Sequence, residues 1–309
     1  MSAVLKRSGL SHFALDGGAL EIGAVSEQCF EVNGRSYTAT VAGEGPVVLC
    51  LHGFPDTKSS FRYQLVALVK AGFRVVCPYM PGYELSSLKD NHYYDLEYLG
   101  NEINALVGVI SAEPVHIVGH DWGAIAAYAA VGKKPKQYAS LTALTIPYNM
   151  ISDTLIFKSP KQIVYSWYIA FFQLRGVAEY VMKAKGFNLI DKLYRDWSPN
   201  WIVPEEQLKA IKAVLSDKRL KQAALGYYRA LRSPSAKKYM HGDIHLPTLL
   251  VRGEDDGCIY AGTWKLINSE CFKKGLTIES VKAGHFLHIE KPKEVNSILL
   301  AHLALHAEG

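Results

Sequence analysis

Apolar residues along the chain fall into two patterns that alternate through the first half of the sequence. Residues 47–51 are all apolar, and a short unbroken apolar run is typical of a strand buried on both faces. Residues 60–71 follow with apolar side chains every three or four positions, which predicts a helix that Gly72 ends. The same patterns predict further strands at 73–77, 115–118, 141–146, 248–252 and 276–281, and further helices at 96–110, 124–131, 263–268 and 292–305.

Strands that alternate with helices predict an α/β protein with a mostly parallel, doubly wound sheet. Before the first buried strand, residues 30–41 predict a pair of strands, and residues 1–27 form a leader of weak periodicity. The alternation stops near residue 148, and residues 148–240 have the pattern of several helices rich in aromatic side chains. The sequence therefore predicts an α/β core, made of 1–147 and 241–309, that is interrupted by a helical lid at 148–240.

The composition is typical of a folded domain, because 49% of the 309 residues are hydrophobic and 20% are charged. The formal net charge of +5 is uneven, since the lid carries +9 and the rest of the chain −4. A solvated basic surface is the common reason for such a distribution, and a field that attracts anionic substrates is the alternative. The sequence contains no motif of the nucleic-acid-binding folds, so nucleic acid is not an expected partner.

The spacing of the cysteines and the sequence of the first residues indicate the cellular compartment. Five cysteines are scattered without CxxC spacing: Cys29, Cys50, Cys77, Cys258 and Cys271. Such spacing predicts reduced thiols, and hence a cytoplasmic protein, rather than a disulfide framework or a zinc site. Residues 1–20 lack the apolar stretch of a signal peptide, and no apolar run exceeds eight residues, so insertion into a membrane is not expected. We expect a monomer or a homodimer.

The pentapeptide Gly119-His120-Asp121-Trp122-Gly123 lies between a predicted strand and an alanine-rich predicted helix. This context predicts a nucleophile elbow, a sharp turn that exposes one side chain above a mostly parallel sheet. Its glycines leave room for a strained backbone. A serine at the centre would favour acyl transfer. An aspartate that attacks an sp³ carbon forms an alkyl ester instead, so Asp121 favours epoxide opening or halide removal.

Cleaving such an ester requires a base, a group that orients the base, and donors for the oxyanion. The predicted base is His285, in a Gly-His-Phe sequence just after the last predicted strand. Two adjacent acids, Asp255 and Asp256, follow the strand at 248–252, and we favour Asp256 as the orienting group. The chain order Asp121, Asp256, His285 is the order expected for this kind of fold. The other histidines considered lie in a strand, in tight motifs or outside any motif: His116, His120, His52, His288 and His245.

The sequence His52-Gly53-Phe54-Pro55 follows the first buried strand and predicts a loop. We expect the backbone N–H groups of Phe54 and Trp122 to be the oxyanion donors, and we include His52 in this binding loop. Pro55 is expected to fix the shape of the loop, with a cis peptide bond as one means.

Together these motifs resemble the epoxide hydrolases of the α/β-hydrolase superfamily over about residues 30–305. The resemblance also rests on Phe61-Arg62-Tyr63-Gln64, Gly82-Tyr83 and Gly253-x-x-Asp256. It implies an α/β-hydrolase fold and a hydrolase with an aspartate nucleophile that requires no metal or organic cofactor. Haloalkane dehalogenases share most of these motifs, so the lid decides between the two kinds of substrate.

Epoxide hydrolases carry two lid tyrosines whose phenols hydrogen-bond the epoxide oxygen. The resemblance assigns the first to Tyr168, in a Tyr-Ile-Ala-Phe-Phe-Gln sequence, although Arg175 stands where the family usually has proline. It assigns the second to Tyr228, in a Tyr-Tyr-Arg sequence, with Tyr227 as the alternative. A phenol of pKa ~10 can donate to a developing alkoxide and stay protonated at neutral pH. Packing in the lid core is the alternative role for either ring.

The expected activity is the hydrolysis of an epoxide to a vicinal diol through a covalent ester on Asp121. The aromatic lid suggests an apolar small molecule as the substrate. A haloalkane dehalogenase is the first alternative, although Phe54 stands where such enzymes often have asparagine as a halide donor. Three lid tryptophans could replace that donor: Trp167, Trp197 and Trp201. The second alternative is a non-catalytic ligand-binding protein on the same fold, against which the complete nucleophile, acid and base argue.

Overall fold

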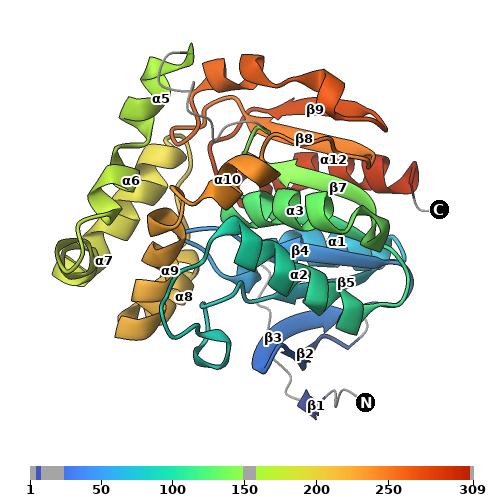
Figure 1. Ribbon diagram of the computed structural model, residues 1–309, viewed down its shortest axis with the longest axis horizontal. Helices are drawn as coiled ribbons and strands as arrows, with labels where there is room; N and C mark the ends of the chain where they lie inside the picture. Colours follow the sequence, from blue (N-terminus) through green and yellow to red (C-terminus); the bar gives the residue numbers. More distant parts are fainter. Residues whose placement is uncertain (1–4, 8–23, 149–157, 307–309) are drawn as a thin grey trace.

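The computed structural model describes residues 5–7, 24–148 and 158–306, which form a nine-stranded sheet with helices on both faces (Figure 1). The order in the sheet is β1-β2-β3-β5-β4-β6-β7-β8-β9. Neighbours from β1 to β5 pair antiparallel, and those from β5 to β9 pair parallel. The predicted mostly parallel α/β sheet is thus confirmed. The strands are β1 (Leu5–Arg7), β2 (Ser26–Val32), β3 (Arg35–Ala42), β4 (Val47–Leu51), β5 (Arg74–Pro78), β6 (Val115–His120), β7 (Tyr138–Leu144), β8 (Thr248–Gly253) and β9 (Leu276–Val281).

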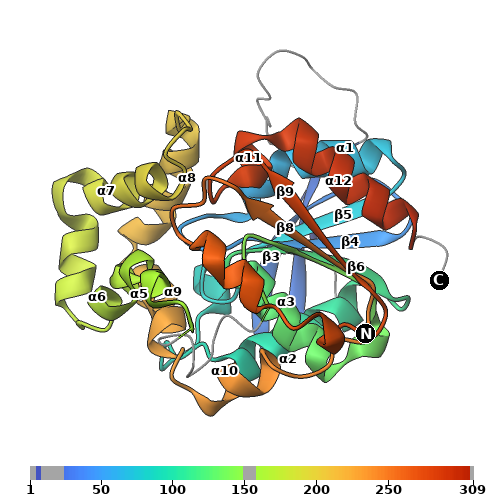
Figure 2. The ribbon, with the colours of Figure 1, turned by 90° about the horizontal axis from the view of Figure 1, so that it is seen from above.

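The core lies around β4 and β6, in which every residue is buried. Both strands are covered on two sides, which explains why their sequences are apolar without alternation. Helices α1 (Arg62–Lys70) and α12 (Pro292–Ala304) pack together on one face, and α2 (Leu96–Ile110) and α3 (Trp122–Lys133) pack on the other (Figure 2). No helix in the described residues is both long enough and apolar enough to cross a membrane.

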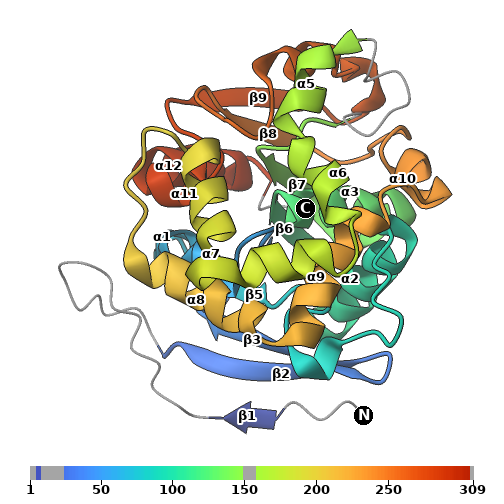
Figure 3. The same cartoon turned by 90° about the vertical axis from the view of Figure 1, so that its left-hand side faces the viewer.

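Helices also connect β7 to β8, in the region where the lid is predicted at 148–240, of which residues 149–157 lie outside the described part of the chain. They are α5 (Pro160–Tyr165), α6 (Trp167–Phe172), α7 (Val177–Trp197), α8 (Glu205–Ser216), α9 (Lys218–Arg229) and α10 (Pro234–Tyr239). Helices α5 to α9 gather on one side of the core (Figure 3). The last helix, α10, packs instead against α2 and α3 of the core.

Two predicted elements differ from the structure. The strand predicted at 141–146 is β7, which ends at Leu144 because Thr145 has a φ of 69° and turns the chain out of the sheet. The prediction of a helix at 263–268 was wrong. This region forms two 3₁₀ segments, Ala261–Leu266 and Ser269–Cys271, because Ile267 and Asn268 adopt extended backbone angles between them. The predicted leader at 1–27 includes β1 and the start of β2.

Candidate active site

Asp121 lies in the turn between β6 and α3, with φ 50° and ψ −119°. Such a conformation costs on the order of 1–3 kcal/mol for a residue other than glycine. The turn is possible because the positions two residues before and two residues after Asp121 are glycine. A Cβ on Gly119 would lie 2.4 Å from the carbonyl oxygen of Gly123, and a Cβ on Gly123 would lie 2.0 Å from that of Leu51. The two glycines therefore allow the backbone segments at this elbow to approach each other closely.

The imidazole of His285 lies between two carboxylates, and all three side chains are buried. Its Nδ1 is 2.9 Å from Asp256 Oδ2, and its Nε2 is 3.5 Å from Asp121 Oδ2. The other oxygen of Asp256 accepts the backbone N–H groups of Cys258 and Ile259, at 2.7 and 2.9 Å. The loop after β8 thus fixes the Asp256 carboxylate, which in turn fixes the orientation of the histidine ring.

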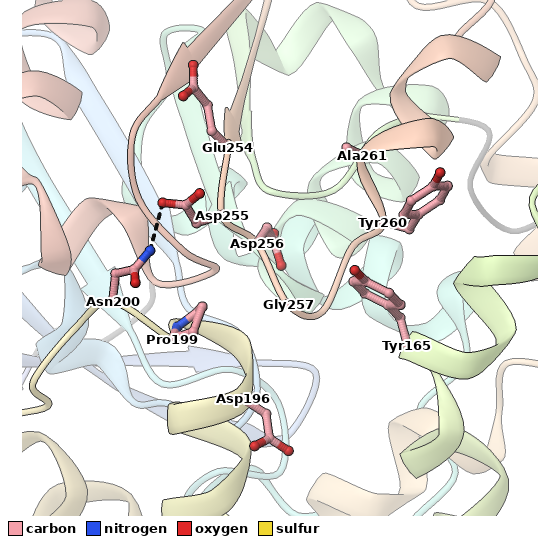
Figure 4. A pocket seen from close by; sticks show the side chains of 10 residues that line it. All are labelled: Tyr165, Asp196, Pro199, Asn200, Glu254, Asp255, Asp256, Gly257, Tyr260 and Ala261. Atoms are coloured by element: carbon pink, nitrogen blue, oxygen red, sulfur yellow. Dashed lines mark hydrogen bonds between the residues drawn. The ribbon is translucent and has the colours of Figure 1, made fainter.

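The neighbouring acid Asp255 points away from the histidine. It accepts hydrogen bonds from Asn200 at 2.9 Å and from Lys282 at 2.7 Å. Figure 4 shows it turned toward Asn200, at a surface pocket of about 480 Å³ that Asp256 reaches from the inner side. Of the two adjacent acids, the fold brings Asp256 to His285.

The charge of His285 depends on both carboxylates. Burial alone would lower its pKa, but the Asp256 carboxylate, and the Asp121 carboxylate that faces its other nitrogen, outweigh burial and raise the pKa to about 9. His285 is therefore protonated at neutral pH.

The pKa of His285 predicts a pH dependence of stability. The folded-state value of about 9 lies above the unfolded value of 6.5, so the stabilisation is complete below about pH 6.5 and is lost as the pH rises through about 9. Its size is on the order of 3 kcal/mol. Thermal unfolding from pH 6 to pH 10 should show a steeper fall in Tm for the wild type than for His285→Gln, which does not titrate. Equal slopes would contradict the assignment.

The loop after β4 runs against Asp121. The backbone N–H of Phe54 donates to Asp121 Oδ1 at 2.7 Å, and a Cβ on Gly53 would lie 2.4 Å from the Asp121 Cβ. Trp122 is the first residue of α3, so its N–H is one of the four at a helix start that have no acceptor within the helix. The peptide bond before Pro55 is cis, as expected.

His52 stays within this loop. Its Nε2 accepts the N–H of Met80 at 3.0 Å, and its Nδ1 lies 3.0 Å from the Gly53 carbonyl oxygen. Burial lowers its pKa to about 4, so the ring is neutral. Since both nitrogens are occupied by backbone groups, His52 shapes the loop that carries Phe54 and has no nitrogen free for a ligand.

Two lid tyrosines face the elbow. The ring centroids of Tyr168 on α6 and Tyr228 on α9 are 5.7 Å apart. The Tyr228 ring packs edge-on against Phe54 and Trp122, at 5.2 Å from each. Its hydroxyl is buried and makes no hydrogen bond of ordinary geometry among the described residues, although it interacts weakly with the Trp122 side chain, whereas the Tyr168 hydroxyl lies 3.2 Å from Cys258 Sγ. Burial, and to a smaller degree the Asp121 charge, raises the pKa of both phenols well above 10.

Tyr227, the alternative to Tyr228, is engaged elsewhere. Its hydroxyl donates to the Pro81 carbonyl oxygen at 2.6 Å, and its ring stacks on Tyr94 at 5.1 Å. The hydroxyl of Tyr228 is therefore the one that α9 leaves free.

The residues around the predicted tyrosine motifs hold the lid helices together. Arg229 donates to the Phe172 carbonyl oxygen at 3.0 Å and to Glu179 at 2.8 Å. Gln173 donates to the Tyr228 carbonyl oxygen at 3.1 Å. These bonds join α6, α7 and α9 and thereby fix both tyrosines. Arg175, which replaces the usual proline, is exposed and does not take part in them.

Two buried groups of side chains have ligand atoms within 4.8 Å of one another, as a metal would require. One group is Asp256, Cys258 and His285, in which the acid and the imidazole already bind each other. The other is Asp56, His120 and His288, which touches the site because His120 Nε2 donates to the His285 carbonyl oxygen at 2.9 Å. Sequence reasoning did not identify Cys258, Asp56 or His288 as neighbours of the site, because no motif marks them.

A mostly parallel sheet with an elbow at the end of a central strand, and a histidine held between two carboxylates, defines an α/β hydrolase. Residues 46–292 match the sequence profile of the α/β-hydrolase fold family, so the chain belongs to that family.

Similar proteins include several epoxide hydrolases, which confirms the predicted resemblance. The chain is 29% identical over 280 residues to the α/β-hydrolase superfamily protein YfhM of Bacillus subtilis, covering 89% of this chain and 97% of that protein. It is 28% identical to human epoxide hydrolase 4, over 86% of this chain and 75% of the relative. The crystal structure of the epoxide hydrolase VrEH1 from Vigna radiata shares the fold with a TM-score of 0.77, at 24% identity over 91% of this chain and 98% of that one.

Proposed function

We propose that this protein is an epoxide hydrolase that converts an epoxide and water to a vicinal diol through a hydroxyalkyl ester on Asp121. The observation that carries the proposal is the buried hydroxyl of Tyr228, which has no acceptor among the described residues, in a site where an Asp121 oxygen lies 3.5 Å from the His285 imidazole. The similarity to relatives named epoxide hydrolases supports it.

In the first step, a carboxylate oxygen of Asp121 attacks one ring carbon and the bond from that carbon to the epoxide oxygen breaks. The oxygen develops negative charge, and the phenols of Tyr168 and Tyr228 donate hydrogen bonds to it. The His285 imidazolium supplies the proton that neutralises this charge. The products of the step are a neutral ester, an alcohol and a neutral imidazole.

The ester itself prepares the second step. Once Asp121 is esterified, one of the two anions that raise the pKa of His285 is gone, so the imidazole becomes a base suited to neutral pH. It takes a proton from water, which adds to the ester carbonyl. The N–H groups of Phe54 and Trp122 stabilise the resulting oxyanion, and each such donor is typically worth about 2.7–4 kcal/mol. The tetrahedral intermediate then collapses: the bond to the diol oxygen breaks, that oxygen takes the remaining proton of the added water, and the diol leaves the Asp121 carboxylate beside a protonated His285.

An epoxide panel run beside a haloalkane panel tests the proposal. We expect diol by chromatography and no halide release with a pH indicator. Halide release without diol formation would favour a dehalogenase. Tight binding of a small molecule with neither reaction would favour a ligand-binding protein.

The two phenols should partly replace each other. We expect Tyr168→Phe and Tyr228→Phe each to lower kcat/KM by up to about 10²-fold, and the double variant to lose more than either. Tyr227→Phe is the matched control, because its hydroxyl binds only the Pro81 carbonyl oxygen, and it should stay within a few-fold of the wild type. A loss at Tyr227 as large as at Tyr228 would contradict the assignment.

A further inference from the structure

The lid exposes apolar side chains to an unusual degree. Twelve large apolar side chains are exposed in the described residues, and half of them lie between residues 163 and 180: Ile163, Val164, Trp167, Leu174, Val177 and Tyr180. We call these six residues the lid patch. Val164 and Tyr180 are 72% and 76% exposed, so they project into solvent. The helices that carry the patch, α5, α6 and the start of α7, lie on the face turned toward the viewer in Figure 3. Clustered exposed apolar residues of this kind mark an interaction surface.

Basic residues are interspersed with the lid patch. Five exposed lysines and arginines lie in the same stretch of chain: Lys158, Lys161, Arg175, Lys183 and Lys185. None of them forms an ion pair within the described part of the chain. Between residues 158 and 188 the one acid is Glu179, which pairs with Arg229 at 2.8 Å. The surface therefore combines apolar and aromatic side chains with basic residues that no ion pair among the described residues compensates, and Asp196 and Glu254 lie nearby, at a pocket beside Tyr165 of α5.

The lid patch lies directly behind the candidate active site. Trp167 is 42% exposed, and the next residue on α6, Tyr168, is buried against Tyr228. One short helix thus presents the outer surface and one wall of the site. If the substrate is an apolar epoxide, as the proposed function implies, it partitions into lipid.

We propose that the lid patch docks peripherally on a membrane surface that contains anionic lipids. Amphipathic Trp and Tyr side chains suit the interface between headgroups and acyl chains, and Lys and Arg bind the anionic headgroups. A second copy of this chain fits less well. A two-fold dimer through the lid patch would place each patch against itself, and its uncompensated positive charges would face one another.

Co-sedimentation of the full chain with vesicles tests the docking without any substrate. We expect at least tenfold more binding to vesicles of phosphatidylcholine with 30% phosphatidylglycerol than to phosphatidylcholine alone, and loss of that binding in high salt. The double variant Val164→Glu/Tyr180→Glu should lose binding at least tenfold. The matched control is Ile278→Glu/Leu305→Glu, which changes two exposed apolar residues far along the chain, at 44% and 78% exposure, and should bind like the wild type.

Absence of binding to the anionic vesicles would overturn the proposal, as would equal loss in the control variant. A dimer in analytical ultracentrifugation that Val164→Glu/Tyr180→Glu converts to monomers, without vesicle binding, would assign the lid patch to a second copy. The test of the proposed function is independent of membrane binding, because turnover is measured on a water-soluble epoxide. We expect the double variant to turn over that epoxide at the wild-type rate.

Discussion

Asp121→Ala should abolish epoxide turnover, with a loss in kcat on the order of 10⁴–10⁶-fold, as when other covalent nucleophiles are removed. No described side chain can replace the carboxylate, because Asp121 is the acid that the elbow carries and Asp256 is bound to the far side of the imidazole. Stopped-flow or chromatographic detection of the diol gives the rate, and circular dichroism reports whether the fold persists. A variant that stays folded and retains more than a few per cent of the activity would contradict the covalent route.

Asp255→Ala is the matched control for this experiment. It removes a carboxylate from the same edge of the sheet, after the carboxyl end of β8, but one that binds Lys282 and Asn200 at the surface, so its activity should stay within a few-fold of the wild type. A single turnover of the wild type in ¹⁸O-water adds an independent test. Water attacks the ester carbonyl in the proposed route, so the first diol should carry oxygen from the protein and remain mostly unlabelled.

The position of the candidate site could be predicted because the residues that define it lie in short sequence motifs. Gly119 and Gly123, two residues on either side of Asp121, have room only for hydrogen, and this constraint can be inferred from the pentapeptide and the strand before it. The order of the nucleophile, acid and histidine follows from the order in which the strands β6, β8 and β9 end. Likewise, the unbroken apolar runs of β4 and β6 mark them as central strands.

What could not be predicted depends on contacts between distant segments. Tyr227 and Tyr228 are neighbours on one helix, and only the Pro81 carbonyl oxygen, 146 residues away, decides which hydroxyl is occupied. The thiol of Cys258 meets Tyr168 across 90 residues, and no local pattern marks that pairing. The failed helix prediction at 263–268 has the same origin, since apolar spacing alone does not reveal where the backbone becomes extended.

His285→Gln should separate the two chemical steps. Glutamine keeps a polar group between the carboxylates but cannot take a proton from water, so hydrolysis of the ester should slow by at least about 10³-fold. The first step should survive, more slowly, because Asp121 and both phenols are intact even though the imidazolium proton is missing. The ester therefore accumulates, and intact-protein mass spectrometry should show an increase equal to the mass of one epoxide.

The double variant Asp121→Ala/His285→Gln is the control for that adduct, because it lacks the carboxylate that would carry it. We expect no mass increase in the double variant, and an adduct on the peptide that contains Asp121 in the single variant. An adduct of equal amount in both variants would show that the epoxide alkylates another side chain. A His285→Gln protein that turns over at the wild-type rate would show that the histidine takes no part in the second step. In the proposed mechanism that step needs a neutral imidazole, and esterification of Asp121 provides it by removing one of the two anions that keep His285 charged.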